Sequence, residues 1–275
     1  MKKIFDFKNN LVSLTLINRP SKSIRSPYVA DAKNSKGKKC LVHVPSLGLA
    51  GQCSNGSKIL ATPSKINSKT DYIAQAVCFE DLHGKQVIIG ANPYTAELIC
   101  KSLIQSDLWN PFKGYDLISK PKSLDHKADL YFEKNKNFNI VEIKNVVCAS
   151  HDPKEFKNGE KTRFYDYKKP FLKAGLYPYG DLNQSYKGKK VVSARSIRQI
   201  DLMKKNRAKF NFYILFVVNR GDCEIFKPNW KADPTYAKSL LSAQQCGITL
   251  LAIKINWTLT GCYFDKELKI DLEEW

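Results

Sequence analysis

The stretch that decides the fold is KADLYFEKNKNFNIVEIKN, residues 127–145, in which two β-like runs flank a polar turn. Successive side chains of a strand point to opposite faces. Glu142 and Lys144 therefore share one face, and the stretch predicts a β-hairpin with one charged and one apolar side. The apolar side is expected to contain these residues: Ala128, Leu130, Phe132, Val141 and Ile143.

The register of this hairpin determines which charges meet. A two-residue turn at 135–136 places Asp129 directly across from Glu142. Two opposed carboxylates repel each other, whereas a hard cation such as Mg²⁺ binds well between them. A turn shifted by one residue instead pairs Asp129 with Lys144 as an ordinary cross-strand ion pair. The local pattern leaves both registers open.

In the first register, the charged face suits phosphodiester cleavage. A divalent cation, Mg²⁺ or Mn²⁺, would be held by Asp129 and Glu142, and Lys144 would lie beside it to orient or deprotonate a water molecule. The candidate catalytic residues are therefore Asp129, Glu142 and Lys144. An acid-x-Lys pattern is common, so the motif alone is weak.

The pattern along the chain changes near residue 84. Residues 1–83 contain short apolar runs separated by Pro, Ser, Asn and Gly, which is typical of a small β-barrel. From residue 84 to 275 strands and helices alternate, with a helix expected after Asn92-Pro93. The apolar runs 212–218 and 248–255 predict parallel strands joined by a helix. We therefore expect two domains, of which the second is α/β.

The charge of the chain points to a polyanionic partner. The 275 residues include 45 Lys+Arg and 26 Asp+Glu, a formal net charge of +19. Residues 1–80 and 151–210 contain most of this excess, and lysine and arginine bind phosphates by releasing counterions. A lysine-rich solvated surface is the alternative. The candidate nucleic-acid contacts are Arg25, Lys168, Lys169, Arg195 and Arg198.

Several other classes are disfavoured. No run approaches the roughly 18 apolar residues of a membrane helix, and residues 1–10 are too charged for a secretory leader, so we expect a cytoplasmic protein. The 8 cysteines form no CxxC pair, which favours reduced thiols over a zinc site. The sequence leaves the oligomeric state open, a homodimer included.

The order of several blocks resembles the sugar fermentation stimulation proteins. The blocks that carry the resemblance are Ile24–Asp31, His43–Gly48, Val141–Val146, Ile214–Arg220 and Asp233–Ala237. The resemblance implies a two-domain α+β/α/β protein that binds DNA, duplex or single-stranded. It implies an OB-like barrel at 1–83, followed at 84–275 by a PD-(D/E)XK nuclease-like domain with a central mixed sheet flanked by helices.

On the nuclease pattern, Asp129, Glu142 and Lys144 match the motif's acid, acid and lysine, and Arg195 matches a later basic position. Ser46 stands where asparagine is expected. The connection at about 149–190 is longer than usual and forms a basic insertion. Glu97 is the nearest candidate for a further metal ligand on a helix, but an i,i+4 pair with Lys101 is favoured.

Three functions therefore remain open. The first is a divalent-metal-dependent deoxyribonuclease. The second is a non-catalytic DNA-binding regulator of sugar-metabolism genes that retains the nuclease fold. The third is an RNA-binding module, since small barrels bind both nucleic acids. Fold resemblance alone does not separate them.

Overall fold

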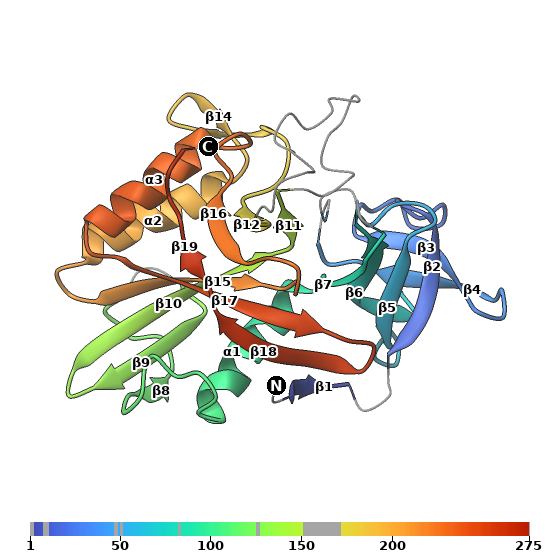
Figure 1. Cartoon of the computed structure of the whole chain (residues 1–275), viewed down its shortest axis with the longest axis horizontal. Helices are drawn as coiled ribbons and strands as arrows, with labels where there is room; N and C mark the ends of the chain where they lie inside the picture. Colours follow the sequence, from blue (N-terminus) through green and yellow to red (C-terminus); the bar gives the residue numbers. More distant parts are fainter. Residues whose placement is uncertain are drawn as a thin grey trace.

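The chain folds into two units of mixed α/β structure that lie side by side (Figure 1). The computed structural model describes residues 3–7, 11–46, 49, 52–81, 84–124, 127–150 and 172–274. The smaller unit is built on one curled antiparallel sheet, and the larger unit is built on a central mixed sheet with helices on both faces. The number of units agrees with the two domains that the sequence predicts.

The sheet of the smaller unit curls until its strands meet again. Its strands are β2 (Val12–Asn18), β3 (Val29–Asn34), β4 (Lys39–His43), β5 (Lys58–Pro63), β6 (Tyr72–Glu80) and β7 (Gln86–Gly90). The strand order is β4-β3-β2-β5-β6-β7, and β4 also pairs with β6 through Val42 and Tyr72. The enclosed core is aliphatic and includes Leu14, Leu16 and Ile59. Along β2, the fully buried Leu14 and Leu16 alternate with less buried residues, as expected for a strand with one face toward the core.

The central sheet of the larger unit has the order β1-β18-β17-β15-β10-β9-β8. Its strands are β1 (Lys3–Asp6), β8 (Asp116–Ile118), β9 (Leu130–Lys134), β10 (Asn137–Val146), β15 (Asn211–Val218), β17 (Thr249–Trp257) and β18 (Gly261–Glu267). Strands β10, β15 and β17 are parallel neighbours, whereas the flanking pairs are antiparallel. β15 is almost wholly apolar because both of its faces are covered.

Three helices cover the central sheet in the described part of the chain: α1 (Pro93–Gln105), α2 (Ala194–Asn206) and α3 (Pro234–Gln245). α1 packs on one face, and α2 and α3 pack together on the other (Figure 1). Asn92 caps α1 by accepting a hydrogen bond from the Tyr94 amide, and Pro93 begins the helix, as the sequence predicts. Each helix thus buries the apolar stripe that its sequence periodicity indicates.

Part of the expected basic insertion is folded onto the body of the larger unit. The remaining strands are β11 (Cys148–Ala149), β12 (Ala174–Tyr177), β13 (Gln184–Tyr186), β14 (Lys189–Val191), β16 (Ile225–Pro228) and β19 (Lys269–Ile270). The Tyr177 ring packs edge-on against Tyr236, and the Tyr186 hydroxyl bonds to Asp201. These aromatic side chains therefore anchor the insertion to the helices.

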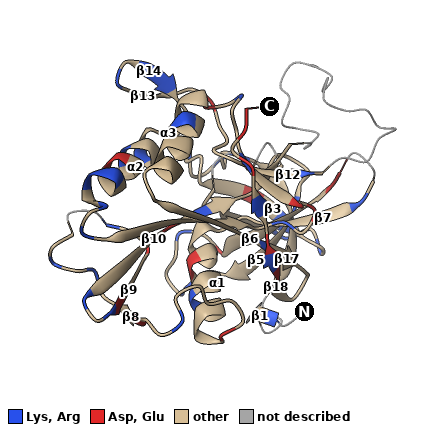
Figure 2. Cartoon of the chain, turned by 60° about the vertical axis from the view of Figure 1, so that its left-hand side comes forward, with Lys and Arg blue, Asp and Glu red and all other residues tan. Residues whose placement is uncertain are grey.

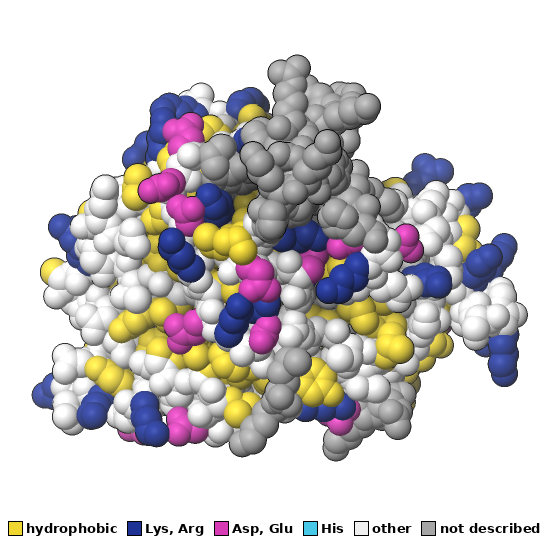
Figure 3. Space-filling view, viewed as in Figure 1, with side chains coloured by type: hydrophobic (Ala, Val, Ile, Leu, Met, Phe, Trp, Pro, Cys, Tyr) yellow, Lys and Arg dark blue, Asp and Glu magenta, His cyan; other side chains and the backbone are white. Residues whose placement is uncertain are grey.

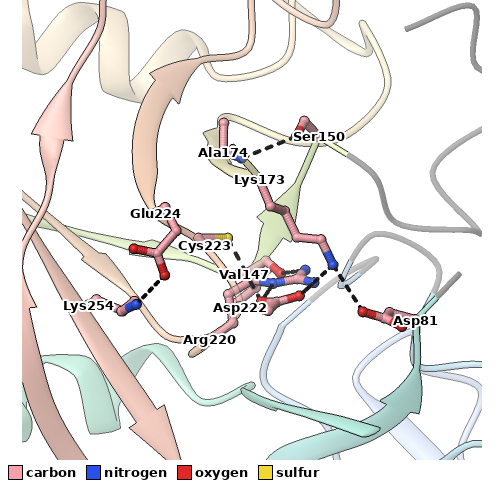
Figure 4. Close-up of polar contacts among 10 residues, drawn as sticks. All are labelled: Asp81, Val147, Ser150, Lys173, Ala174, Arg220, Asp222, Cys223, Glu224 and Lys254. Carbon is pink, nitrogen blue, oxygen red and sulfur yellow. Dashed lines mark hydrogen bonds and ion pairs between the residues drawn. The ribbon is translucent and has the colours of Figure 1, made fainter. Parts of the chain in front are cut away.

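The two units are joined by a buried ionic cluster (Figure 4). Arg220, which is fully buried, donates two hydrogen bonds to Asp222 at 2.7 and 2.8 Å and one to the Val147 carbonyl at 2.9 Å. Lys173 bridges Asp222 at 2.9 Å and Asp81 at 3.4 Å. Asp81 directly follows β6 of the smaller unit, so the cluster couples that unit to the larger one.

The strand pairings also show how the chain passes between the units. β1 pairs with β18 of the larger sheet, although it precedes the smaller unit in sequence. β7 pairs with β6 of the smaller sheet, and it lies beyond residue 84. The boundary between residues 83 and 84 stays a prediction. Across the described ranges, no helix is both long and apolar enough to traverse a lipid bilayer.

Candidate functional site

The hairpin of β9 and β10 adopts the first of the two registers. Lys134 pairs with Asn137, and Leu130 pairs with Val141. Asn135 and Lys136 both have positive φ, at 50° and 63°, which is the backbone of a two-residue type I′ turn. The predicted two-residue turn and its register are therefore confirmed as far as Leu130–Val141, and the shifted register is excluded. Asp129 lies just beyond this last pair, so its direct opposition to Glu142 stays a prediction.

Asp129 lies at the point where β9 leaves the ladder. Its amide still donates to the Val141 carbonyl at 3.1 Å, and its carboxylate Oδ2 accepts a hydrogen bond from the Ile143 amide at 2.6 Å. The Asp129 carboxylate thus takes the place of the backbone carbonyl that would accept this hydrogen bond if β9 were longer. Strand alternation stops there, and Ala128 packs in the core beneath α2 and α3 instead of beside Leu130. The expectation that Ala128 belongs to the same apolar face was wrong.

Glu142 and Lys144 project from β10 toward α2 and form a buried pair. Lys144 Nζ lies 2.7 Å from Glu142 Oε1, and both residues are less than a tenth exposed. Gln199 of α2 completes the arrangement, because its Nε2 donates to Glu142 Oε1 at 2.6 Å and its Oε1 accepts from Lys144 at 2.8 Å. The three side chains form a closed triangle that fixes the lysine and the carboxylate.

The electrostatics of Asp129 reflect its burial beside another acid. Burial raises the pKa of Asp129 to about 6, and the nearby Glu142 charge adds to this rise. The Ile143 amide and Lys144 act in the opposite direction, and Glu97 contributes a further upward shift of the pKa. Desolvation and like charge are the two causes that favour a neutral carboxyl. A cation between the oxygens of Asp129 and Glu142 would offset both the desolvation and the repulsion between like charges.

Glu97 is the acid on α1 for which the sequence offered two roles, a further metal ligand or an ion pair with Lys101. Its charge raises the pKa of Asp129 and of the buried Cys100 thiol, so it lies near both. Within the described residues, Glu97 forms no ion pair with Lys101. The favoured expectation of a local helix pair is therefore wrong, and Glu97 instead lies toward the acidic end of the hairpin.

The sequence reasoning missed Gln199. The signal that could have found it is a pair of polar residues, Ser196 and Gln199, three apart on a helix face that is otherwise buried and apolar. Buried polar side chains need hydrogen-bond partners. Ser196 bonds to the Tyr177 hydroxyl at 2.9 Å, and Gln199 bonds to the hairpin.

The other predicted contacts lie apart from this site. Arg195 and Arg198 are exposed on α2, with Arg195 one turn before Gln199. Arg25 is exposed on the smaller unit. Lys168 and Lys169 fall outside the described residues. Among those that are described, no three His, Cys, Asp or Glu side chains form a ready-made metal cage.

Comparison with known proteins adds three findings. The family model described as "Sugar fermentation stimulation protein RE domain" matches residues 191–261. A sugar fermentation stimulation protein homolog of Thioalkalivibrio sulfidiphilus is 22% identical over 97% of this chain and 98% of its own length. One from Carboxydothermus hydrogenoformans is 32% identical, over 28% of this chain and 34% of that protein.

A solved structure, Pyrococcus furiosus SfsA in complex with Ca²⁺, superposes with a TM-score of 0.73 at 22% identity, covering 98% of this chain and 100% of that one. The likeness extends the shared fold over both units. Fold and site together define a two-domain mixed α/β protein with an acid–lysine cluster on its central hairpin. In sequence and in fold, the chain is similar to the sugar fermentation stimulation proteins.

Proposed function

We propose that this protein binds DNA and hydrolyses its phosphodiester bonds with a divalent cation, Mg²⁺ or Mn²⁺, held by Asp129 and Glu142. The observation that carries the proposal is that Asp129 bonds to the residues on either side of Glu142, with the Lys144 ammonium 2.7 Å from Glu142. Acid, acid and lysine in this arrangement can hold a metal beside a phosphate and stabilise developing negative charge.

The order of elements supports a PD-(D/E)XK nuclease-like domain at 84–275. Helix α1, the β8–β9–β10 meander, helix α2 and the parallel strand β15 follow in the sequence that this class uses. In the smaller unit, the closure of β4 onto β6 supports an OB-like barrel at 1–83. A barrel of this kind offers a surface for oligonucleotides beside a catalytic domain.

The donor set at the hairpin fits a hard cation. Asp129 and Glu142 supply oxygen ligands, which Mg²⁺ and Mn²⁺ prefer. The raised pKa of Asp129 indicates that the site concentrates negative charge where solvent is scarce. A related protein has been solved in complex with Ca²⁺, another oxygen-seeking ion. When bound, such an ion supplies Lewis-acid polarisation of the phosphate.

The chain's own residues have distinct tasks in this proposal. Asp129 and Glu142 bind the cation, and the charge of Glu97 on α1 adds to the negative field at Asp129. Lys144 supplies a fixed positive charge beside the phosphate. Gln199 positions both Lys144 and Glu142 through its two hydrogen bonds. A group held on a helix and two strands is more rigid than one on loops.

Binding to DNA would use the positive surface. The ribbon is coloured blue at Lys and Arg positions along β14, α2 and α3 (Figure 2), whereas basic and acidic residues are interspersed on the face shown in Figure 3. Arg195 and Arg198 lie on the exposed side of the helix that holds Gln199. They are suited to phosphate contacts beside the acid cluster, with Arg25 as a more distant contact on the smaller unit.

A non-catalytic DNA-binding regulator is the second candidate, and one observation favours it. Glu142 Oε1 already accepts hydrogen bonds from both Lys144 and Gln199, so a cation must compete with a buried ion pair. Such pairs are stable when geometry is good. The charge pattern is the same for both candidates, and only metal binding and cleavage separate them.

The deciding experiment is a cleavage assay on single-stranded, duplex and branched DNA with Mg²⁺, Mn²⁺ or EDTA. Cleavage should require the metal and be abolished by Glu142→Ala and by Lys144→Ala, because each removes part of the cluster. Glu133→Gln, in the same hairpin but outside the cluster, is the matched control and should cleave normally. Cleavage that persists in the purified double variant would refute the hydrolase.

Binding is tested separately in EDTA. For about six phosphate contacts, affinity for DNA should fall by about 10³-fold between 50 and 200 mM salt. An affinity that barely responds to salt contradicts phosphate binding. Competition with RNA distinguishes the third candidate, since an RNA-binding module would prefer the RNA competitor.

A further inference from the structure

A cavity of about 290 Å³ lies between the two units, at the end of β10. Its lining includes Tyr28 and Ser46 from the smaller unit and Asn145, Tyr177 and Tyr179 from the larger one. Ligand pockets are often found between domains, and this one is at the small end of their usual range, about 300 Å³. It therefore suits a single ring system.

The aromatic walls of the cavity are held in place. Tyr28 is 40% exposed and lies beside the His43 ring, with centroids 6.5 Å apart. Tyr177 packs edge-on against the buried Tyr236, and its hydroxyl bonds to Ser196. Fixed rings contributed by both units form a surface on which a planar group can stack.

Asn145 gives the cavity a directional polar group. Its Oδ1 accepts a hydrogen bond from Asn219 Nδ2 at 2.6 Å. Asn219 is fully buried, and its own Oδ1 accepts from the Trp257 indole at 2.9 Å. This chain fixes the orientation of the Asn145 amide, so the group it presents to the cavity is its amino group, a hydrogen-bond donor.

The cavity is also connected to the acid cluster. Asn145 directly follows Lys144 on β10. Tyr177 bonds to Ser196, which precedes Gln199 by three residues on α2. The cavity therefore lies within one layer of side chains from the site that we propose to cleave DNA.

We propose that this cavity binds one unpaired nucleobase, which stacks on the tyrosine rings while the Asn145 amino group donates to an acceptor on the base edge. The proposal rests on the proposed function and deepens it, because it selects nucleic acid with an extruded or single-stranded base. Every base has an aromatic face and at least one acceptor. Recognition would thus tolerate sequence but require a base.

The test uses the full chain in EDTA and single-stranded DNA with 2-aminopurine at one position, or an abasic site there. Base stacking should quench the fluorescence, and the abasic oligonucleotide should bind about ten-fold more weakly. Tyr28→Ala and Asn145→Asp should each remove most of the quenching and of this difference. Asn145→Asp keeps the oxygen that accepts a hydrogen bond from Asn219, but it replaces the amino group that would donate to the base with a second oxygen.

Two controls define the result. Tyr28→Phe retains the ring and should quench like the wild type. Tyr115→Ala removes a half-buried tyrosine that directly precedes β8 and does not line the cavity, and it should also quench normally. Equal quenching in the wild type, Tyr28→Ala and Asn145→Asp overturns the proposal, as does equal binding of the abasic oligonucleotide.

A second arm titrates free 2-aminopurine nucleoside monophosphate. Tyr28-dependent quenching by this nucleotide, without any binding of the oligonucleotide, supports the nucleobase site but contradicts the proposed function. Oligonucleotide binding without Tyr28-dependent quenching in either arm leaves the proposed function standing and refutes the cavity proposal. The two ideas therefore fail separately.

Discussion

Asp129 shows how one side chain can end a strand and begin a site. Its carboxylate accepts a hydrogen bond from the Ile143 amide, so this amide has a partner at the point where β9 leaves the sheet. The same position holds its carboxylate near Glu142, where burial and like charge raise its pKa to about 6. A residue that served only the hairpin would not need this charge, since an amide accepts the same hydrogen bond.

This charge predicts that Asp129→Asn stabilises the apo protein above neutral pH. In the folded state the pKa of Asp129 exceeds the ordinary value of 3.8, so protonation of this carboxyl stabilises the fold. This contribution is complete below about pH 4 and is lost as the pH rises through 6. The variant should gain about 1–2 kcal/mol at pH 8, after discounting for partial exposure, and almost nothing at pH 4.

Urea unfolding in EDTA at both pH values measures this difference. Asp116→Asn, at the exposed start of β8, is the control and should change the free energy of unfolding by less than about 0.5 kcal/mol. A loss of stability for Asp129→Asn at pH 8 would contradict the account of the site as a concentration of negative charge.

Asp129 also predicts how the metal acts on stability. Mn²⁺ should raise the melting temperature of the wild type, because a ligand that binds only the folded state stabilises it by mass action. Asp129→Asn should lose this increase while remaining folded, and Asp116→Asn should keep it. An equal increase in all three proteins would mean that the ion binds elsewhere.

At the scale of elements, the hairpin turn is the feature that fixes the site. Asn135 and Lys136 both adopt the left-handed backbone, in which a Cβ is unfavourable. Asn-Gly is the preferred pair for this turn, so Lys136 makes the turn less favourable than glycine would. The turn still determines the register, because any slip would move Glu142 away from Asp129.

Lys136→Gly should therefore stabilise the protein by about 1 kcal/mol. Lys136→Ala removes the same charge but keeps the Cβ, and it should give no gain. Thermal or urea unfolding of both variants measures the effect. If alanine stabilises as much as glycine, the cause is the lysine charge and not the backbone.

Elements are also where sequence reasoning succeeded and failed. The apolar run of β15 and the Asn92-Pro93 start of α1 were predictable because strand burial and helix capping leave local signals. Gln199 was not predictable as a partner of Glu142, because 57 residues separate them and only the packing of α2 onto β10 joins them. Glu97 could be named as a candidate from the sequence, but its closeness to Asp129 depends on how α1 packs on the sheet.

At the scale of the whole molecule, the ionic cluster determines how the two units sit together. Burial raises the pKa of Asp222, but the hydrogen bonds and charges of Arg220 and Lys173 outweigh this and hold it well below its usual range. The Arg220 guanidinium also lies over the Phe79 ring of β6, 5.3 Å from its centroid. Trp257 packs so closely on Gly90 of β7 that an added Cβ would lie 2.5 Å from the indole.

Asp222→Asn should cost about 3–5 kcal/mol at neutral pH, since it removes the carboxylate charge that Arg220 and Lys173 share in a buried cluster. A lowered pKa stabilises the fold above about pH 4 and loses this effect as the pH falls, so the cost should shrink in acid. Unfolding curves at pH 7 and pH 3 measure it. Asp107→Asn breaks an exposed pair with Lys113 and, as the control, should leave the free energy of unfolding almost unchanged.

The pairing of β1 with β18 has a consequence for biosynthesis. Lys3 lies opposite Tyr263, so β1 waits for a partner that is synthesised about 260 residues later. At roughly 5–20 residues per second, this delay is roughly 13–50 s. The strands of the smaller sheet all emerge within that interval, so this sheet can close while the edge of the larger one is still untranslated.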